Sequence, residues 1–197
     1  MMGMYEEFNV LDDFKLSGMP ILDYSNAFVI NAENDKFSDL ESMIAYMKDH
    51  PGEVSFNIVD AGTAAQKTTE LLGKRLDVIG TQAGLVRDYL TTGQFTCLGI
   101  LADEAMSLDD VKLPTLKEQG YDVVFSKFFY LAAPNDVDDE VITTMNEALL
   151  KAVENETFQN YCASALSNTT SMTPEETERY YQEQYDLYAE YLAEYIE

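Results

Sequence analysis

The sequence predicts an α/β fold built around a parallel sheet, and two observations carry this prediction. Between residues 57 and 103, three short apolar runs rich in β-branched residues alternate with two helical patterns. Each run ends at glycine or another small residue. Strands that alternate with helices are typical of βαβ units. Their right-handed crossovers bring both helix N-termini to the carboxyl edge of the sheet, where open α/β sheets bind ligands. The runs are Asn57–Val59, Leu76–Ile79 and Phe95–Leu101.

The composition indicates a globular and strongly acidic protein. At 197 residues, the chain is long enough for one domain or two small lobes. Apolar residues make up 46% of it and aromatic residues 12%, which is unlike a disordered chain. Against 36 acidic residues stand 12 basic ones, a net charge of −24. Such a surface repels nucleic acid and anionic membranes, so no nucleic-acid partner is expected.

Several kinds of chemistry find no support in the sequence. Two cysteines and one histidine make a disulfide framework or a zinc site improbable, and Cys97 and Cys162 are expected to be small buried hydrophobic residues. The motifs of serine hydrolases and of nucleotide-binding loops are absent. We therefore expect no enzyme activity, no cofactor and no metal. The chain has no apolar run long enough to span a membrane, and its first residues show no export signal.

The residues before the sheet predict two strands and a helix. Phe14–Leu22 and Ala27–Ile30 have strand composition and flank a turn at residues 23–26. Ser38 and Glu41 have the spacing of a capping box, which opens an amphipathic helix that a Pro-Gly pair ends. His50 lies in the last turn of this helix, where an interaction with the helix dipole or a C-cap role is expected rather than a catalytic one.

The two crossover helices have start and stop signals at their ends. Gly73 is expected at the C′ position of the first helix, and Thr81 at the N-cap of the second, which Gly93 ends. Helix N-termini present free backbone amides, which hold a carboxylate without any bound cation. The alternative is that these amides are only capped in the ordinary way.

A long apolar strand is expected at Tyr121–Ala132, with Lys127 in its middle. An ammonium group there needs a partner, which is either an acidic neighbour or the carboxylate of a ligand. The acidic run at residues 135–140 is expected to start a helix rather than to bind calcium, because it lacks the spacing of an EF-hand loop.

The last part of the chain predicts two more helices. One covers about Glu156–Ala165, and the other begins at Thr173, followed by Pro at N1 and Glu at N3. A stripe of large side chains at helical spacing predicts that this final helix docks against the domain, with partner binding as the alternative. The stripe consists of Tyr181, Tyr185, Tyr188, Leu192 and Tyr195.

Four stretches, in this order along the chain, carry a family resemblance: Phe37–Gly52, Asp60–Val78, Leu113–Gly120 with its V-P-T-x-x-E-Q-G-like run, and Thr173–Glu176 with the string T-P-E-E. Together they resemble the receptor (solute-binding) proteins of the tripartite tricarboxylate transporters, the TctC or Bug family. The resemblance implies a type II periplasmic-binding-protein architecture, in which two α/β lobes flank a cleft. One lobe would comprise residues 33–105, and residues 1–32 and 106–197 would form the remnant of the other.

The same resemblance implies binding rather than catalysis. A small carboxylate would be held in the cleft and passed to membrane permease subunits, and the protein would be extracytoplasmic. The chain is expected to be incomplete relative to the family: the N-terminal portion and one internal βα unit are missing, and Val54–Phe56 runs directly into the next strand. The bulky Tyr130 replaces a glycine of the family pattern. The ligand-binding positions that remain are Asp60, Ala61, Gly62, Thr63, Thr81, Gln82, Ala83, Ser126, Lys127 and Phe128.

Two hypotheses of different classes follow. The first is a carboxylate-binding receptor, or a shortened relative of one. The second is a structural or interaction protein that no longer binds solute, such as a homodimer in which one protomer completes the other. A sheet that has lost one βα unit exposes a strand edge and apolar surface, which favours such pairing.

Overall fold

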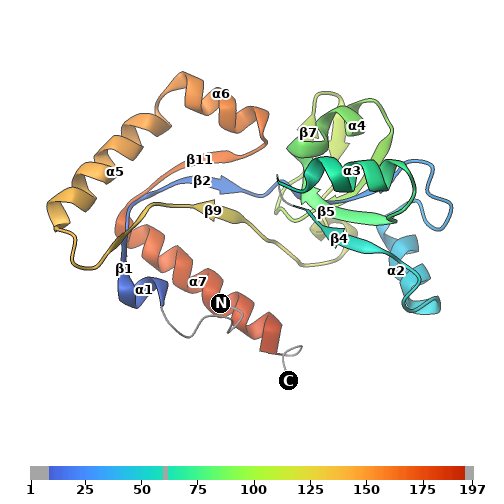
Figure 1. Cartoon of the computed structure of the whole chain (residues 1–197), viewed down its shortest axis with the longest axis horizontal. Coiled ribbons are helices and arrows are strands. Elements are labelled where there is room, and N and C mark those ends of the chain that lie inside the picture. The colour runs from blue at the N-terminus through green and yellow to red at the C-terminus, as the bar shows by residue number, and fades with distance from the viewer. Residues whose placement is uncertain (1–8, 60–61, 194–197) are drawn as a thin grey trace. The chain divides into compact units, whose positions relative to one another are not determined.

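The computed structural model describes residues 9–59 and 62–193. The chain divides into two compact units, each described here by itself (Figure 1). Unit 1 comprises Met1–Leu22, Phe128–Cys162 and Asn168–Glu197, and unit 2 comprises Asp23–Lys127 and Ala163–Ser167. Among the described helices, none is long and apolar enough to cross a membrane.

A four-stranded sheet forms the centre of unit 2, in the order β4-β5-β3-β6. Strand β4 is parallel to β5, whereas β3 is antiparallel to both β5 and β6. The α/β fold is therefore as predicted, but the sheet is mixed because β3 lies between two strands that were expected to be neighbours. Strands β4, β5 and β6 still point the same way and share one carboxyl edge. The strands are β4 (Phe56–Ile58), β5 (Val78–Gln82), β3 (Asn26–Asn31) and β6 (Phe95–Ile100).

Two hydrophobic clusters cover the two faces of this sheet. Val29 and Ile79 pack with Leu71 of α3 on one face, whereas Ile30 and Val78 pack on the α2 side of the other. Side chains alternate across a strand, so each strand contributes to both clusters. The remaining elements of unit 2 are α2 (Leu40–Asp49), α3 (Ala64–Leu72), the 3-10 turns η1 (Ala83–Val86) and η2 (Lys117–Gln119), α4 (Arg87–Thr91), and the hairpin β7 (Met106–Leu108) and β8 (Val111–Leu113).

Unit 1 is mostly helical and is built around an aromatic cluster. Tyr181 of α7 is 4% exposed, and its ring lies edge-on to Phe128 and Tyr130 at 5.9 Å each. The helices are α1 (Val10–Asp13), α5 (Asp139–Val153), α6 (Glu156–Ser164) and α7 (Pro174–Ala193). The strands are β1 (Phe14–Leu16), paired with β10 (Ala132–Pro134), and a sheet of β11 (Asn168–Met172), β2 (Met19–Asp23) and β9 (Lys127–Phe129).

The tyrosine stripe of α7 packs at one end and is open to solvent further along. Tyr181 is buried, as expected of a docking face, and Tyr188 is half-buried. Tyr185, however, is 41% exposed. The side chain of Leu192 and the whole of Tyr195 lie outside what the structure describes. The docking prediction is thus confirmed for the first part of the stripe.

Two strand predictions were too long. The run Phe14–Leu22 is divided at Ser17 into β1 and β2, which belong to different sheets. The strand breaks because the backbone between β1 and β2 bonds to groups outside both strand pairings. The Ser17 N–H donates to the Leu131 carbonyl, and the Gly18 N–H donates to the Asn146 side chain at 3.1 Å. The run 121–132 likewise forms only β9 and the first residue of β10, with irregular backbone over 121–126.

Two cap predictions were wrong by one residue. Asp39, not Ser38, is the N-cap of α2, and its carboxylate accepts from the Ser42 amide at 2.7 Å while the Ser42 hydroxyl accepts from the Asp39 amide. A carboxylate is the better acceptor for the positive end of a helix, so it takes the cap in preference to the serine. At the other end of the helix, His50 is the C-cap, as predicted. At the end of α3, Gly73 is the C-cap, and Lys74 occupies the left-handed position with φ 55°.

Candidate functional site at the carboxyl edge of the unit 2 sheet

The carboxyl edge of the sheet brings together the turn before α3 and the end of β5. Ile58, at the end of β4, is paired with Gly80, and the Val59 amide donates to the Gly80 carbonyl at 2.8 Å. The chain then turns into α3, whose N-cap is Thr63. Thr63 and Thr81 therefore lie at the same edge of the sheet. The carboxylate site expected from the sequence requires these two residues at one edge.

Thr81 lies inside β5 and is not the N-cap that the sequence predicts. The strand continues through Gln82, because the antiparallel neighbour β3 pairs with it up to Asn26. Thr81 is 2% exposed, and its hydroxyl has no hydrogen-bond partner within the described part of the chain. A buried hydroxyl without a partner is costly, so it calls for a group that is absent from the structure.

Gln82 and Ala83 direct their donors into the protein itself. The Gln82 side-chain amide donates to the Asp23 carboxylate, and the Ala83 backbone amide donates to the Ser25 carbonyl at 2.8 Å. The segment after Gln82 is a 3-10 turn rather than a helix with a free N-terminus. Neither residue therefore offers the free donor expected of it.

Asn26 is a second unpartnered polar residue at this edge, and the sequence reasoning missed it. It is 8% exposed, and its side-chain nitrogen has no acceptor among the described residues. It lies opposite Gln82 in the ladder, one position from the pair formed by Ala27 and Thr81. Because side chains alternate, Asn26 and Thr81 reach the same sheet edge on opposite faces. In the sequence, Asn26 belongs to a segment with turn composition, which hides its place in a strand.

The N-terminus of α3 has the electrostatic character that an anion needs. Thr63 makes no side-chain cap to the helix, and the first turn contains no acidic residue. Within its first turn, this nine-residue helix therefore has no carboxylate that would repel an anion from its positive end. Gly62 immediately precedes Thr63, whereas Asp60 and Ala61 lie outside the described residues.

The three predicted residues around β9 have different surroundings. Ser126 is 3% exposed, and Phe128 packs into the aromatic cluster of unit 1 against Tyr181 at 5.9 Å. Lys127 is half-buried, and none of the ion pairs among the described residues includes it. An acidic neighbour from residues 9–59 or 62–193 is therefore not the partner of Lys127.

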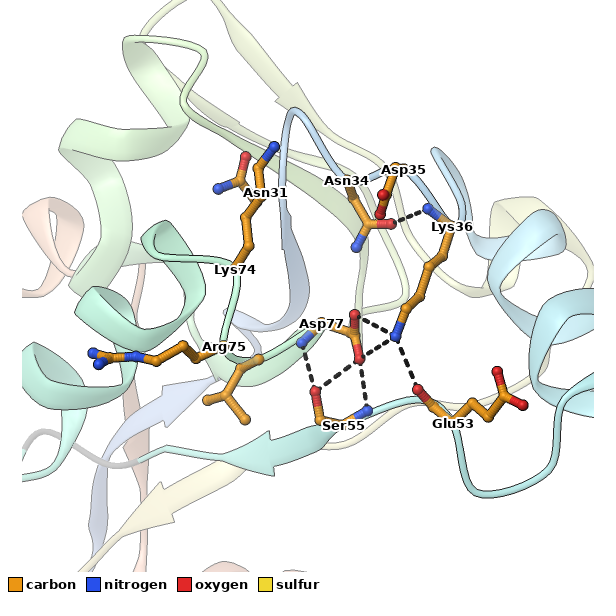
Figure 2. A pocket seen from close by; sticks show the side chains of 10 residues that line it. Asn31, Asn34, Asp35, Lys36, Glu53, Ser55, Lys74, Arg75 and Asp77 are labelled. Carbon is orange, nitrogen blue, oxygen red and sulfur yellow. Dashed lines mark hydrogen bonds and ion pairs between the residues drawn. The ribbon is translucent and has the colours of Figure 1, made fainter.

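A polar pocket lies at the opposite, amino edge of the same sheet (Figure 2). Its volume is about 390 Å³, and its centre is the Asp77 carboxylate. This group accepts from the Lys36 ammonium, at 2.9 Å to one oxygen and 3.0 Å to the other, and from the Ser55 amide and hydroxyl at 2.8 and 2.7 Å. The pocket is lined by Asn31, Asn34, Asp35, Lys36, Glu53, Ser55, Lys74, Arg75, Leu76 and Asp77.

The charges of this pocket neutralise one another. Burial acts to raise the pKa of Asp77, but the hydrogen bonds from Ser55 and Lys36 hold it below its usual value. The hydrogen bond to Asp77 raises the pKa of Lys36. Lys74 pairs with Glu33 at 3.2 Å, and Figure 2 shows Arg75 pointing away from Lys36. The cations therefore do not converge, and this arrangement is typical of a structural ion-pair network rather than an anion site.

Comparisons with known proteins agree with the fold and the order of the elements. Residues 64–192 match the model of the family described as "Tripartite tricarboxylate transporter family receptor", TctC. BugT from Bordetella pertussis is 25% identical over 167 residues, which cover 72% of this chain and 51% of BugT. The chain thus spans about half the length of that curated relative.

Two solved structures share the fold. The periplasmic binding protein BugD has a TM-score of 0.74 and 18% identity, over 92% of this chain and 69% of its own. A protein of R. palustris, solved with adipate, has a TM-score of 0.76 and 13% identity, over 96% of this chain and 71% of its own. The α/β fold, of the periplasmic-binding-protein type and incomplete relative to these structures, is therefore confirmed. Because the family match spans well over half of the sequence, the chain belongs to the receptor family of the tripartite tricarboxylate transporters, the TctC or Bug solute-binding proteins.

Proposed function

We propose that this protein is a receptor that binds a small carboxylate at the carboxyl edge of the unit 2 sheet. It would be an extracytoplasmic protein that passes the ligand to membrane permease subunits, and it would catalyse no reaction. Family membership and the adipate in the R. palustris structure support the ligand class. The observation that carries the proposal for this chain is the Thr81 hydroxyl, which is buried without a partner among the described residues.

The donors at this edge suit a carboxylate. The Thr81 hydroxyl would donate one hydrogen bond, and the amides at the start of α3 would supply the positive end of a helix dipole. Lys127, half-buried without an ion pair in the described ranges, would compensate the remaining ligand charge. Of the predicted positions, the unit 2 residues Gly62, Thr63, Thr81, Ser126 and Lys127 stay in the proposed site.

Thermal unfolding in the presence of small carboxylates tests the proposal. Propionate, succinate and tricarballylate form a matched series with one, two and three carboxylates. A ligand that binds only the native state raises the melting temperature by mass action. We expect a rise that Thr81→Val abolishes. Thr177→Val is the matched control, because the Thr177 hydroxyl of α7 is equally buried and unpartnered in the described residues. If none of the three ligands raises the melting temperature, the receptor proposal is wrong.

A second candidate function, association into a homodimer, is favoured by the outer edge of β4. Ile58 is 79% exposed and Phe56 is 40% exposed, both on the edge strand of the unit 2 sheet. Residues 54–59 carry no charge, so this edge lacks the charged residues that usually prevent strand pairing. In a chain of net charge −24, an uncharged edge is also where two copies repel each other least.

Sedimentation tests this second candidate. A dimer that pairs through β4 should dissociate in Ile58→Lys, which places a charge on the pairing surface. Leu72→Lys, at a side chain that is 41% exposed on α3, is the control for a charge added elsewhere. A strictly monomeric wild-type protein at micromolar concentration would remove the dimer from consideration.

A further inference from the structure

The carboxyl edge also contains an acidic residue that the carboxylate site does not explain. Asp23 is fully buried and is the last residue of β2, three positions before the start of β3 at Asn26. One of its oxygens accepts from the Ser25 amide at 2.8 Å and from the Ser25 hydroxyl at 2.6 Å. The other accepts from the Gln82 side-chain amide. Three donors directed at both oxygens suit the ionised carboxylate, which only accepts hydrogen bonds.

The charge of Asp23 has no cationic partner in the described ranges of the chain. None of their ion pairs includes it. It is anchored to Gln82, which follows Thr81 in β5, and to Ser25, which precedes Asn26 in β3. The Asp23 carboxylate is therefore hydrogen-bonded to the residue next to each of the two unpartnered donors, Asn26 and Thr81. The same contacts use one N–H of the Gln82 amide and the hydroxyl proton of Ser25.

We propose that Asp23 determines which ligand charge this site accepts, so that a carboxylate of net charge −1 or zero binds in preference to a di- or tricarboxylate. The proposal rests on the function proposed above. Asp23 is buried, so it acts through its field rather than by contact with the ligand. A like charge in a partly buried environment repels each additional ligand carboxylate, and the low effective dielectric constant maintains this repulsion over several ångströms.

Asp23→Asn is the decisive substitution, because it removes the charge and preserves the shape. The new side-chain carbonyl would still accept from Ser25. Gln82 would turn its amide so that its own carbonyl accepts from the new side-chain nitrogen. Asp122→Asn is the control for a lost charge, since the Asp122 side chain is 90% exposed in the same unit. Dissociation constants for propionate and succinate, measured by calorimetry at one ionic strength, give the preference of each protein.

The wild type should bind propionate at least as tightly as succinate. In Asp23→Asn, the preference should move toward succinate by about tenfold, as expected for a unit charge several ångströms away. In Asp122→Asn, it should stay at the wild-type value. The proposal is overturned if the wild-type protein binds succinate more tightly than propionate. It is also overturned if Asp23→Asn weakens the binding of both ligands equally, which would indicate a purely structural role. If neither ligand binds the wild-type protein, the receptor function is refuted as well. The failure of the charge preference can therefore be distinguished from the failure of the receptor function.

Discussion

The backbone amide of Lys74 donates to the carbonyl of Leu71 at 3.0 Å, and Lys74 itself has a φ of 55°. The Arg75 amide also donates to the Glu70 carbonyl, at 2.8 Å. These two backbone hydrogen bonds together are the pattern of a Schellman motif. The motif needs a left-handed residue, and a lysine in that conformation costs about 1 kcal/mol more than glycine. The helix end is therefore locally strained.

Lys74→Gly should consequently be more stable than Lys74→Ala by about 1 kcal/mol. Both variants lose the ion pair with Glu33, so their difference reports the backbone alone. Urea unfolding followed by circular dichroism measures it. Gly120→Ala, at a glycine with φ 92°, should lose a similar amount. Equal stabilities of the two Lys74 variants would show that this residue is not strained.

Removal of the Lys36 ammonium should destabilise unit 2. Lys36→Met leaves the Asp77 carboxylate, whose side chain is 16% exposed, without its cation, at a cost of about 1–3 kcal/mol. The effect should depend on pH. The folded-state pKa of Asp77 lies below 3.8, so its stabilising contribution is present above that value and disappears as pH falls through the folded pKa. Unfolding titrations at neutral pH and below pH 3.8 should show the variant's deficit shrinking in acid; a deficit that does not change with pH would contradict this account.

Tyr181 should make the alkaline stability of unit 1 depend on pH. Burial raises its pKa from 10.0 to about 12. A raised folded-state pKa gives a stabilising contribution that is present below pH 10 and is lost as pH rises through about 12. Tyr181→Phe removes the ionisable hydroxyl, so its stability should decline less steeply over this range. Identical pH profiles for the two proteins would mean that the Tyr181 hydroxyl is accessible to water.

Both thiols should react slowly in the native protein. Burial raises the pKa of Cys97 to about 12, and it also raises the pKa of Cys162, which is 1% exposed. Since the thiolate is the reactive form, labelling by an alkylating reagent at neutral pH should be slow until the protein unfolds. Cys97→Ala and Cys162→Ala separate the two rates. Rapid native labelling of either thiol would contradict the burial described here.

The sequence was most informative where local signals and burial agree. The α/β class, the three sheet runs and the helix starting at Pro174 were all predictable, because periodicity and capping residues specify them locally. The insertion of β3 between β5 and β6 was not, because strand order depends on long-range pairing that no short pattern encodes.

The site was predictable only at the level of its edge. The sequence placed Thr63 and Thr81 at one edge of the sheet, but Thr81 was assigned to a helix cap because the strand end could not be located to the residue. Asn26 and Asp23 were hidden in a segment with turn composition. Their positions beside Gln82 depend on the pairing of β3 with β5, which is a tertiary feature.

The central claim is that a carboxylate binds at the carboxyl edge of the unit 2 sheet, and backbone amide chemical shifts recorded during a propionate titration test it most directly. The account predicts that the largest saturable changes fall on residues 62–66 and 80–83. Changes confined to residues 31–36 and 74–77, around the pocket of Figure 2, would contradict it, as would a spectrum that does not change at any propionate concentration.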